Sequence, residues 1–373
     1  MRRTDPHLRG RPTRRSAALA AAAAAALVLS ACSSGSAGGG SSAGSGSGAG
    51  SGAKLKMGIA VANISLNFAH EMVLGAQSAA DHAGGVDWTA VGPPNTDGPA
   101  EQQLFTSLTS TAHDGVVLEN LDPPIFTRPA AQAVAKGVPI VALDTSPTPG
   151  SGVTFYVGND NYQLGVELAQ ETLKRLGTDP HGTVVVGEPN PGTPVLDSRA
   201  KGIKDTLNAK APGITVLGPF QTYSDPAQNY SAWLSQVHAQ PHALAFLGVG
   251  DADSYDLARI KQQEKGSYLV AGMDVDAKTL EDVKAGLDFV TIDPEHFLKG
   301  YIATTLLIDA VKQHKSLPQG WFETPGLVVD QSNVDAIIQR ETSAQAAYSW
   351  YKSQIDSLLG DVAANLKPLS DAR

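Results

Sequence analysis

Short apolar runs, many of them rich in β-branched residues, alternate with amphipathic segments from residue 54 onward. The apolar runs predict buried strands over 55–61, 86–91, 115–118, 139–143, 153–157, 183–187, 215–220, 243–247, 268–271, 288–292 and 326–329. Apolar residues at helical spacing predict helices between most of them, for example over 101–111, 162–176, 253–264 and 297–314. This alternation favours an α/β fold built of βαβ units with mostly parallel sheets.

Polar and aromatic side chains follow most of the predicted strands. Ligands of parallel α/β sheets bind beyond the carboxyl ends of the strands, so these side chains are candidates for one binding site. The candidates are Asn63, Asn67, Phe68, Asn120, Asp122, Asp144, Thr145, Asn159, Asp160, Glu188, Asn190, Tyr223, Asp225, Asp251, Asp253, Asp274, Asp276, Asp293 and Glu295. For Asp160, Asp253 and Asp276, which precede helical segments, a role as helix N-cap is the open alternative.

The N-terminus has the features of an export signal. An arginine-rich stretch precedes the alanine-rich apolar run 16–31, which is too short to span a bilayer as a mature helix, so residues 1–31 are expected to be a signal peptide. Cys32, the single cysteine, directly follows Ala31. This arrangement resembles the lipobox of bacterial lipoproteins, which implies a lipid on Cys32 and attachment to the outer face of the cytoplasmic membrane. Export by the general or the twin-arginine route stays open.

Composition limits the remaining possibilities. Residues 32–53 are almost all Gly, Ser and Ala after the cysteine, which predicts a flexible tether. The rest is long enough to favour two domains. The net charge of −9 becomes more negative when the arginine-rich leader is removed, which makes nucleic acid an unfavourable partner. A single cysteine permits no internal disulfide and no Cys-x-x-Cys metal site, and we expect neither a metal nor a cofactor.

Several segments carry a family resemblance in their order along the chain. They are 55–61 with Asn67 and Phe68, 114–120, 137–144, 156–165, 192–202, 270–274 and 299–301. Together they resemble the ribose-type sugar-binding proteins of bacterial ABC importers, which are type I periplasmic binding proteins, over residues 55–330. The resemblance implies two doubly wound lobes, each with a six-stranded and mostly parallel sheet, joined by a three-segment hinge. Lobe one would comprise 54–157 plus 294–325, lobe two 158–293 plus 326–332, and a helical C-terminal extension 333–373.

The resemblance also implies roles for individual residues in a cleft between the lobes. Phe68 matches an aromatic residue that stacks on the sugar, and Asn120 matches an asparagine that bonds its hydroxyls. Asp144 and Asp274 match aspartates that follow a strand in each lobe. The full set of expected ligand-binding residues is Phe68, Asn67, Asn120, Asp144, Asp197, Arg199, Tyr223, Asp251, Asp274 and Asp293.

Some positions depart from the family pattern. Ala69 stands where a second aromatic residue is expected, and Thr145 stands where an arginine usually follows the first aspartate. Asp197 falls where a ligand-binding arginine is common, although Arg199 is close. We therefore expect a pocket rich in acceptors and short of cationic donors, which disfavours ribose itself. Sugar hydroxyls donate well to carboxylates, so a sugar or polyol remains the expected ligand.

These observations predict an extracytoplasmic, monomeric solute-binding lipoprotein that captures a sugar or polyol and delivers it to the transmembrane subunits of an ABC permease. One alternative is a binding protein that reports to a membrane sensor, and another is a binder of a cationic amino sugar or amine. A glycoside hydrolase is a distant alternative, because acid pairs such as Asp251 and Asp253 exist. The sequence contains neither His-Glu-x-x-His nor Gly-x-Ser-x-Gly, so we expect no enzyme.

Overall fold

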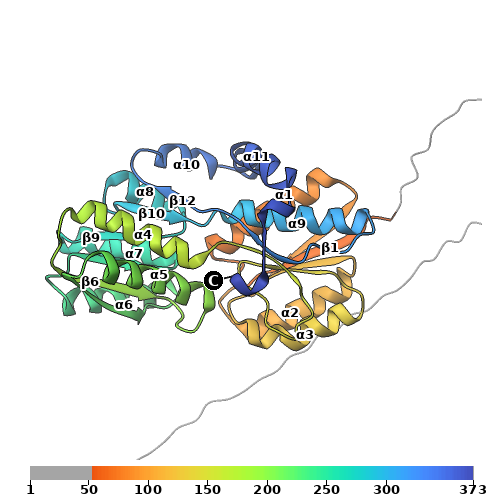
Figure 1. Ribbon diagram of the computed structural model, residues 1–373, viewed down its shortest axis with the longest axis horizontal. Helices are drawn as coiled ribbons and strands as arrows, with labels where there is room; N and C mark the ends of the chain where they lie inside the picture. Colours follow the sequence, from red (N-terminus) through yellow and green to blue (C-terminus); the bar gives the residue numbers. More distant parts are fainter. Residues whose placement is uncertain (1–52, 373) are drawn as a thin grey trace, which may run out of the picture. The chain divides into compact units, whose positions relative to one another are not determined.

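The computed structural model describes residues 53–372. The predicted signal peptide, Cys32 and nearly all of the predicted tether lie outside the described residues. Within the described residues, the chain forms two sheets, each covered by helices on both faces (Figure 1). The predicted α/β fold with two mostly parallel sheets is confirmed. We use lobe one and lobe two for the first and second sheet together with the helices that pack on each.

Lobe one contains a seven-stranded sheet in the order β13-β11-β5-β4-β3-β1-β2. Its strands are β1 (Leu55–Ala60), β2 (Val86–Val91), β3 (Gly115–Glu119), β4 (Ile140–Leu143), β5 (Phe155–Gly158), β11 (Gly320–Glu323) and β13 (Leu366–Lys367). All neighbours are parallel except β11 and β13. The resemblance implied six strands, and the seventh arises because β13, from the predicted helical extension, pairs along the free edge of β11.

Lobe two contains a six-stranded sheet in the order β12-β10-β9-β8-β6-β7. Its strands are β6 (Gly182–Glu188), β7 (Ile214–Gln221), β8 (Ala245–Gly248), β9 (Leu269–Met273), β10 (Val290–Asp293) and β12 (Leu327–Val329). All neighbours are parallel except β10 and β12. The two sheets have the same strand order when β11 of lobe one is matched with β12 of lobe two. The other matching pairs are then β5 and β10, β4 and β9, β3 and β8, β1 and β6, and β2 and β7.

Helices cover both faces of each sheet, which explains why the strands are continuous apolar runs. In lobe one, α1 (Asn67–Ala83) and α9 (His296–Lys312) lie on one face, and α2 (Gly98–Thr111) and α3 (Pro123–Ala135) lie on the other (Figure 1). In lobe two, α4 (Asn161–Leu176) and α5 (Pro194–Lys210) lie opposite α6 (Pro226–Ala239) and α7 (Asp251–Glu264). Val184 and Val186 face α4 and α5, whereas Val185 faces α6 and α7.

The chain passes between the two sheets at four points. Three are the connections from β5 to α4, from β10 to α9 and from β11 to β12, and the fourth is the return from β12 to β13. After β12, the chain forms α10 (Val334–Arg340) and α11 (Ala344–Gly360). The first of these packs beside α8 (Ala277–Ala285) of lobe two, and the second packs on α1 and α9 of lobe one (Figure 1).

Candidate ligand-binding site

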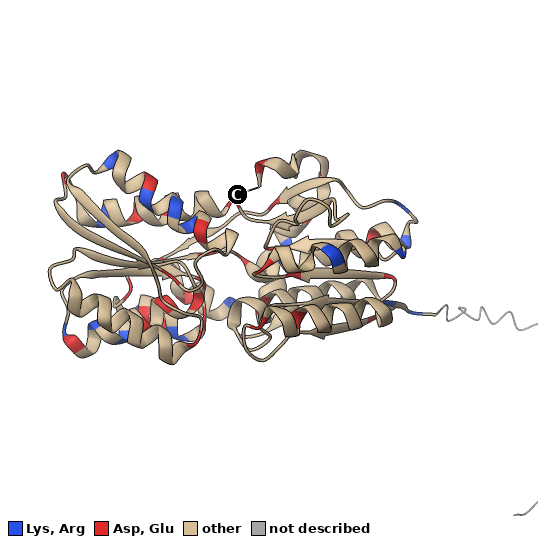
Figure 2. Ribbon diagram, turned by 90° about the horizontal axis from the view of Figure 1, so that it is seen from below, with Lys and Arg blue, Asp and Glu red and all other residues tan. Residues whose placement is uncertain are grey.

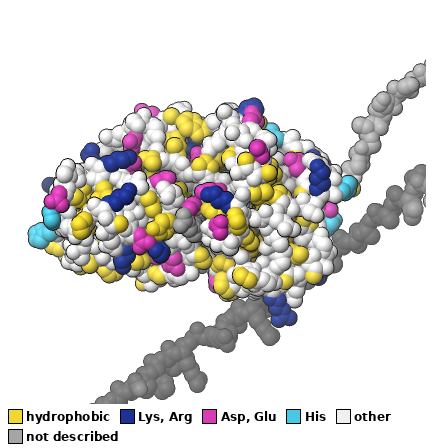
Figure 3. Space-filling model, in the orientation of Figure 1, with side chains coloured by type: hydrophobic (Ala, Val, Ile, Leu, Met, Phe, Trp, Pro, Cys, Tyr) yellow, Lys and Arg dark blue, Asp and Glu magenta, His cyan; other side chains and the backbone are white. Residues whose placement is uncertain are grey.

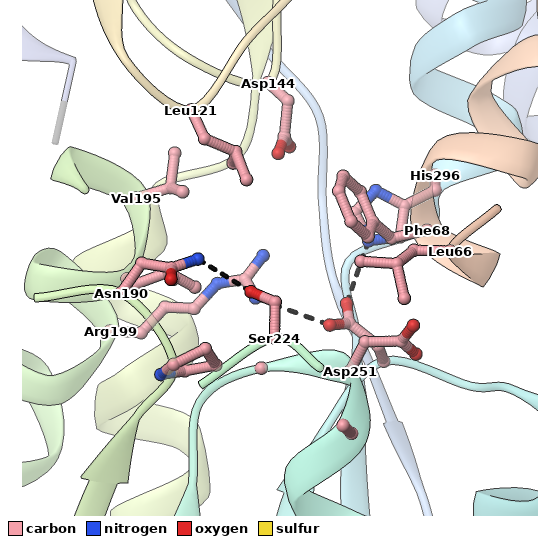
Figure 4. Close-up of a pocket in the computed structure, with 15 residues that line it drawn as sticks. Leu66, Phe68, Leu121, Asp144, Asn190, Val195, Arg199, Ser224, Asp251 and His296 are labelled. Carbon is pink, nitrogen blue, oxygen red and sulfur yellow. Dashed lines mark hydrogen bonds and ion pairs between the residues drawn. The ribbon is translucent and has the colours of Figure 1, made fainter. Parts of the chain in front are cut away.

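A cavity lies between the carboxyl ends of the two sheets and has walls from both lobes. It encloses about 480 Å³ of empty space, part of which is open to solvent. Figure 4 shows the side chains around it, and Figure 2 shows acidic residues gathered near the junction of the lobes. The lining residues are Leu66, Phe68, Leu121, Asp144, Pro189, Asn190, Val195, Leu196, Arg199, Ser224, Gly250, Asp251, Ala252, Asp274 and His296.

Asp144 and Asp274 face this cavity from opposite lobes in the same backbone setting. Each directly follows a strand, β4 or β9, and each has a left-handed backbone with φ of 62° or 70°. The amide of Asp144 donates to Val157 at 2.9 Å, and that of Asp274 donates to Ile292 at 2.9 Å. Left-handed backbone costs about 1–3 kcal/mol in a residue with a side chain and is found where structure holds a functional group in place. The repeated geometry therefore marks both aspartates as positioned groups.

The Asp144 carboxylate forms a buried ion pair within lobe one. The ammonium of Lys299, from α9, donates to its Oδ1, and neither side chain is exposed. The hydroxyl of Tyr156 donates to the Asp144 carbonyl at 2.8 Å. Burial by itself would raise the pKa of Asp144, but the positive charge of Lys299, the largest opposing effect, lowers it to about 2. Asp144 is therefore ionised at neutral pH.

Asp274 has cationic and polar partners from both lobes. His296, at the start of α9 in lobe one, lies with its Nε2 2.8 Å from Asp274 Oδ1. Arg199, from α5 in lobe two, lies with its guanidinium 3.8 Å from Oδ2. Burial opposes ionisation of Asp274, but Arg199 and the hydrogen bond from His296 lower its pKa. The carboxylate of Asp274 thus joins the two lobes across the cavity.

Arg199 is fixed in this position by two further hydrogen bonds. Its Nε donates to Asn161 Oδ1 at 3.0 Å, and its Nη1 donates to the carbonyl of Val249 at 3.0 Å. Its side chain is almost fully buried. A planar guanidinium held on two sides keeps its remaining N–H groups directed at one place, which suits recognition of an oxygen.

The remaining walls divide into apolar and polar parts. Apolar side chains of both lobes form most of the lining, and the Phe68 ring lies 5.8 Å from the His296 ring with an interplanar angle of 54°. The Asn190 amide donates to the Ser224 hydroxyl at 2.7 Å. Burial, with the nearby charges of Asp274 and Asp276, raises the pKa of Asp251 well above its ordinary value. A cavity with an apolar face and a few fixed polar groups is typical of small-molecule sites.

The family of the chain follows from this architecture and from sequence comparison. A family model described as a periplasmic binding protein domain matches residues 57–315, which is more than half of the chain. The chain belongs to this family. The D-allose-binding periplasmic protein of Escherichia coli (strain K12) is 24% identical to this periplasmic binding protein over 234 residues, which are 61% of this chain and 75% of that one.

Solved structures agree with this assignment. An ABC transporter solute-binding protein from Burkholderia graminis C4D1M, solved in complex with D-arabinose, is 26% identical with a TM-score of 0.69, covering 76% of this chain and 97% of that one. A glucose-galactose binding protein from Geobacillus stearothermophilus, GanP, is 20% identical with a TM-score of 0.68, covering 75% and 99%. At 20% identity, the similarity to GanP shows the fold alone. The predicted resemblance to type I sugar-binding proteins is confirmed.

In this periplasmic binding protein, half of the predicted ligand-binding residues line the cavity. These residues are Phe68, Asp144, Arg199, Asp251 and Asp274. Asn67 lies beside the cavity, where its backbone N–H bonds to Asp251 while its side chain donates to Glu71 at 2.5 Å. The roles of these residues toward a ligand stay a prediction.

The other predicted residues lie elsewhere. Asn120 lines a smaller, separate cavity under α3. Asp197 is exposed and accepts a hydrogen bond from the Gly192 amide at 3.0 Å, so it fixes a loop. Tyr223 is 39% exposed and does not line the cavity. Asp293 is fully buried and forms an ion pair with Arg340 at 2.7 Å, next to the connection from β10 to α9.

The charged lining of the cavity consists of three acids, Asp144, Asp251 and Asp274, and one cation, Arg199. A second cation, Lys299, bonds to Asp144 directly behind the wall. Lys299 was not predicted as part of the site, because it lies 155 positions after Asp144 inside an apolar helix. A lone lysine in that apolar stretch was the available signal, since a buried lysine needs an anionic partner.

No group of three or more His, Cys, Asp or Glu side chains within residues 53–372 could hold a metal ion. Among those same residues, none of the helices has the length and apolar character needed to cross a bilayer. On the face in Figure 3, basic and acidic side chains are interspersed.

Proposed function

We propose that this periplasmic binding protein captures a neutral monosaccharide or similar polyol in the cavity between its lobes. The observation that carries the proposal is the pair of ionised aspartates, Asp144 and Asp274, which face one cavity from opposite lobes and already have cationic partners. Carboxylates with lowered pKa can only accept hydrogen bonds, so they favour a ligand that brings hydroxyl donors.

The charges of the site favour a neutral ligand. The two ionised carboxylates are balanced by Lys299 and Arg199, and burial together with the charge of Lys299 lowers the pKa of His296, which keeps its ring neutral. A cationic amine would add an unbalanced charge to a site that excludes most water, which is costly. This balance argues against the amine-binding alternative.

Hydrogen bonds and packing together set the strength of such binding. Hydrogen bonds to charged groups contribute about 1.5–3 kcal/mol each, so one bond to each of two aspartates and an arginine contributes about 4.5–9 kcal/mol, and packing of the ligand must supply the rest of a micromolar affinity and the association cost. The Phe68 ring and the aliphatic side chains offer an apolar face to the C–H surface of a sugar ring. The D-allose-binding and D-arabinose-bound relatives support a sugar as the ligand.

Binding would also close the protein. A ligand that bonds to Asp144 and Asp274 at once is held by both lobes, and it therefore stabilises the conformation in which the lobes are close. We expect the protein to act outside the cytoplasm, tethered through lipid on Cys32, and to present the closed form to an ABC permease. The relatives are binding proteins, which supports a role without catalysis.

The test is a binding screen of the purified protein by calorimetry against D-allose, D-arabinose, D-galactose, D-glucosamine and myo-inositol. We expect binding of at least one neutral compound, and Asp144→Asn and Asp274→Asn should each weaken it by about tenfold to a hundredfold. His70→Gln, a change at an exposed site on α1, is the control and should leave affinity unchanged. Binding of glucosamine alone, or insensitivity to both aspartate changes, would refute the proposal.

A further inference from the structure

We infer that His296 is itself a ligand-binding residue, accepting a ligand hydroxyl at Nδ1 while Asp274 of the other lobe fixes its tautomer. The inference rests on the proposed function and adds a specificity rule to it. No pattern in the sequence assigned this residue to the ligand, because it follows the strand end of β10 by three positions and begins an apolar helix.

The position of His296 connects the two lobes. It is the first residue of α9, which packs on α1 in lobe one, directly after the chain has crossed from β10 in lobe two. Its Nε2 lies 2.8 Å from Oδ1 of Asp274, and its side chain is 2% exposed. The ring also lines the cavity, beside Phe68 (Figure 4).

The partners of the ring decide which nitrogen carries the proton. Asp274 is held ionised by Arg199, so it can only accept, and His296 Nε2 must donate to it. Burial, and then the positive charge of Lys299, lowers the pKa of the imidazole, so the ring is neutral near pH 7. A neutral ring protonated at Nε2 has a lone pair at Nδ1.

That lone pair has no partner among the described residues. Nδ1 of His296 is buried and makes no hydrogen bond within residues 53–372. Buried acceptors are seldom left unpaired in folded proteins, so the atom is poised for a donor from outside the chain. A hydroxyl of a ligand in the cavity is such a donor.

This arrangement predicts which sugars the site prefers. Three acceptors, on Asp144, Asp274 and His296, surround the cavity, and Arg199 is the strong donor. A suitable ligand carries several hydroxyls, one of them beside the face that packs near Phe68. Replacing that hydroxyl by hydrogen or by a methyl ether should remove the bond to Nδ1. Since the tautomer depends on Asp274, this contact forms only when the lobes are together.

The two functions of the ring can be separated by substitution. His296→Gln can keep a donor near the Nε2 position, toward Asp274, but removes the Nδ1 acceptor. His296→Asn keeps a polar atom near the Nδ1 position but cannot reach Asp274. Exposed His70→Gln is the control. Each variant and the wild type are measured by calorimetry against D-allose, D-arabinose and their singly deoxygenated analogues.

For the wild type, one deoxygenated analogue should bind about three- to tenfold more weakly because it lacks the hydroxyl that pairs with Nδ1. In His296→Gln, the penalty for that analogue should vanish while penalties at other positions persist. An unchanged set of penalties in His296→Gln would overturn the inference. If no sugar binds, the proposed function fails, but ¹⁵N NMR of the imidazole still tests His296, because a ring protonated at Nδ1 would contradict the geometry.

A separate observation concerns the C-terminal segment, residues 330–362. It is the fourth connection between the lobes, and we propose that it restrains their opening. Val334 and Ile337 of α10 belong to a core of lobe two that includes Leu280. Tyr351 and Ile355 of α11 belong to the core of lobe one. Only residues 341–343 join these two helices.

A buried polar cluster fastens this segment to the hinge. Arg340 is 2% exposed and lies 2.7 Å from Asp293, with its guanidinium 5.1 Å from the centre of the Tyr351 ring. Gln354 donates to Glu295 at 2.9 Å. Asp293 and Glu295 flank the connection from β10 to α9, so the segment holds the crossover itself. A short link between two anchored helices limits how far the anchors can separate.

The test is an insertion of Gly-Ser-Gly between Thr342 and Ser343, which loosens the link and leaves both helix interfaces intact. The same insertion between Thr178 and Asp179, in an exposed turn, is the control. We expect a larger ligand-dependent change in radius of gyration by X-ray scattering than in the control, with an unchanged melting temperature. If the two insertions give the same compaction, the segment does not restrain opening.

Discussion

The two lobes place an aspartate in the same setting but neutralise it from different helices. Asp144 follows β4 and Asp274 follows β9, which occupy corresponding places in the two sheets. Both have left-handed backbone and both are bonded through the amide to the neighbouring strand. The strand ends therefore repeat closely between the lobes.

The helix pairs behind the aspartates repeat as well. In lobe one, a Cβ added to Gly75 of α1 would lie 2.0 Å from the Phe297 carbonyl, and one added to Gly300 of α9 would lie 2.1 Å from that of Met72. In lobe two, the corresponding clashes are at Gly165 of α4 and Gly202 of α5, at 2.0 and 2.1 Å. In both lobes the helices meet backbone to backbone at reciprocal glycines, which only glycine allows.

The cations break this repeat. In lobe one, the cation Lys299 directly precedes Gly300 on α9, the helix that follows a crossover between the lobes. In lobe two, the cation Arg199 lies three residues before Gly202 on α5, a helix that follows a strand of its own lobe. The position equivalent to Lys299 in lobe two, one residue before Gly165, is Leu164 on α4. The position equivalent to Arg199 in lobe one, three residues before Gly75, is Met72 on α1, so both equivalent positions are apolar. The comparison shows that each lobe needs a buried cation near its aspartate, and that the helix supplying it can differ.

Removing the cation of lobe one should change the stability of the protein most, and it tests whether each lobe depends on its own cation. Lys299→Met leaves Asp144 buried without its ion-pair partner, so we expect a loss of about 3–5 kcal/mol in the free energy of unfolding, measured by urea denaturation. Adding Asp144→Asn should restore part of it, because the unpaired charge is then gone. Lys315→Met, at an exposed position, is the control. A loss below 1 kcal/mol would mean, on this scale, that the pair is not buried.

The same change in lobe two should cost less. Arg199→Met removes one partner of Asp274, but the hydrogen bond from His296 survives. We expect a loss of about 2–4 kcal/mol in the free energy of unfolding, smaller than that of Lys299→Met under the same conditions. A larger loss than in lobe one would show that the Arg199 bonds to Asn161 and Val249 matter more than its charge.

The repeated helix contacts predict equal effects in the two lobes. Gly75→Ala and Gly165→Ala each force a methyl group against a carbonyl of the facing helix. Overpacking of this kind costs about 1–3 kcal/mol, which exceeds the helix-propensity gain of about 1 kcal/mol from alanine. Thermal unfolding should show matched decreases. Gly360→Ala, with open space around the added methyl, is the control, and a decrease confined to one lobe would contradict the repeat.

The smallest effect concerns the pH dependence of stability. Burial raises the pKa of Glu119, at the end of β3 near Asp144, from its ordinary value near 4.5 to about 8. The folded state then holds a proton that the unfolded state has released, so stability falls as pH rises from about 4.5 to 8. Glu119→Gln should flatten this decline in urea midpoints measured at pH 5 and pH 8. Exposed Asp87→Asn should leave the decline as it is.

Much of the candidate site could be read from strand ends. Asp144 and Asp274 are predictable because each directly follows a buried strand, and a polar residue in that position lies at the sheet edge where ligands bind. Asp293 met the same criterion but lies in the hinge, paired with Arg340. Local position predicts that a side chain lies near the sheet edge, but not which partner it meets there.

Short edge strands were also beyond the sequence pattern. The run over 320–323 was not predicted as a strand, and β13 has only two residues. Both exist because backbone groups pair with a neighbour that is distant in the chain, Trp321 with Tyr156 on one side and with Lys367 on the other. Such pairing depends on register between remote segments and leaves no period in the local sequence.

The sequence by itself determined the alternation of strands and helices, the mostly parallel strand pairing and the aspartates at the strand ends, because periodicity and strand ends are local properties. Only the tertiary structure decided the charge of the site. Lys299 reaches Asp144 across 155 positions, and His296 reaches Asp274 across the boundary between the lobes. Electrostatic partners are fixed by distance in space, and that distance is known only once the helices have packed.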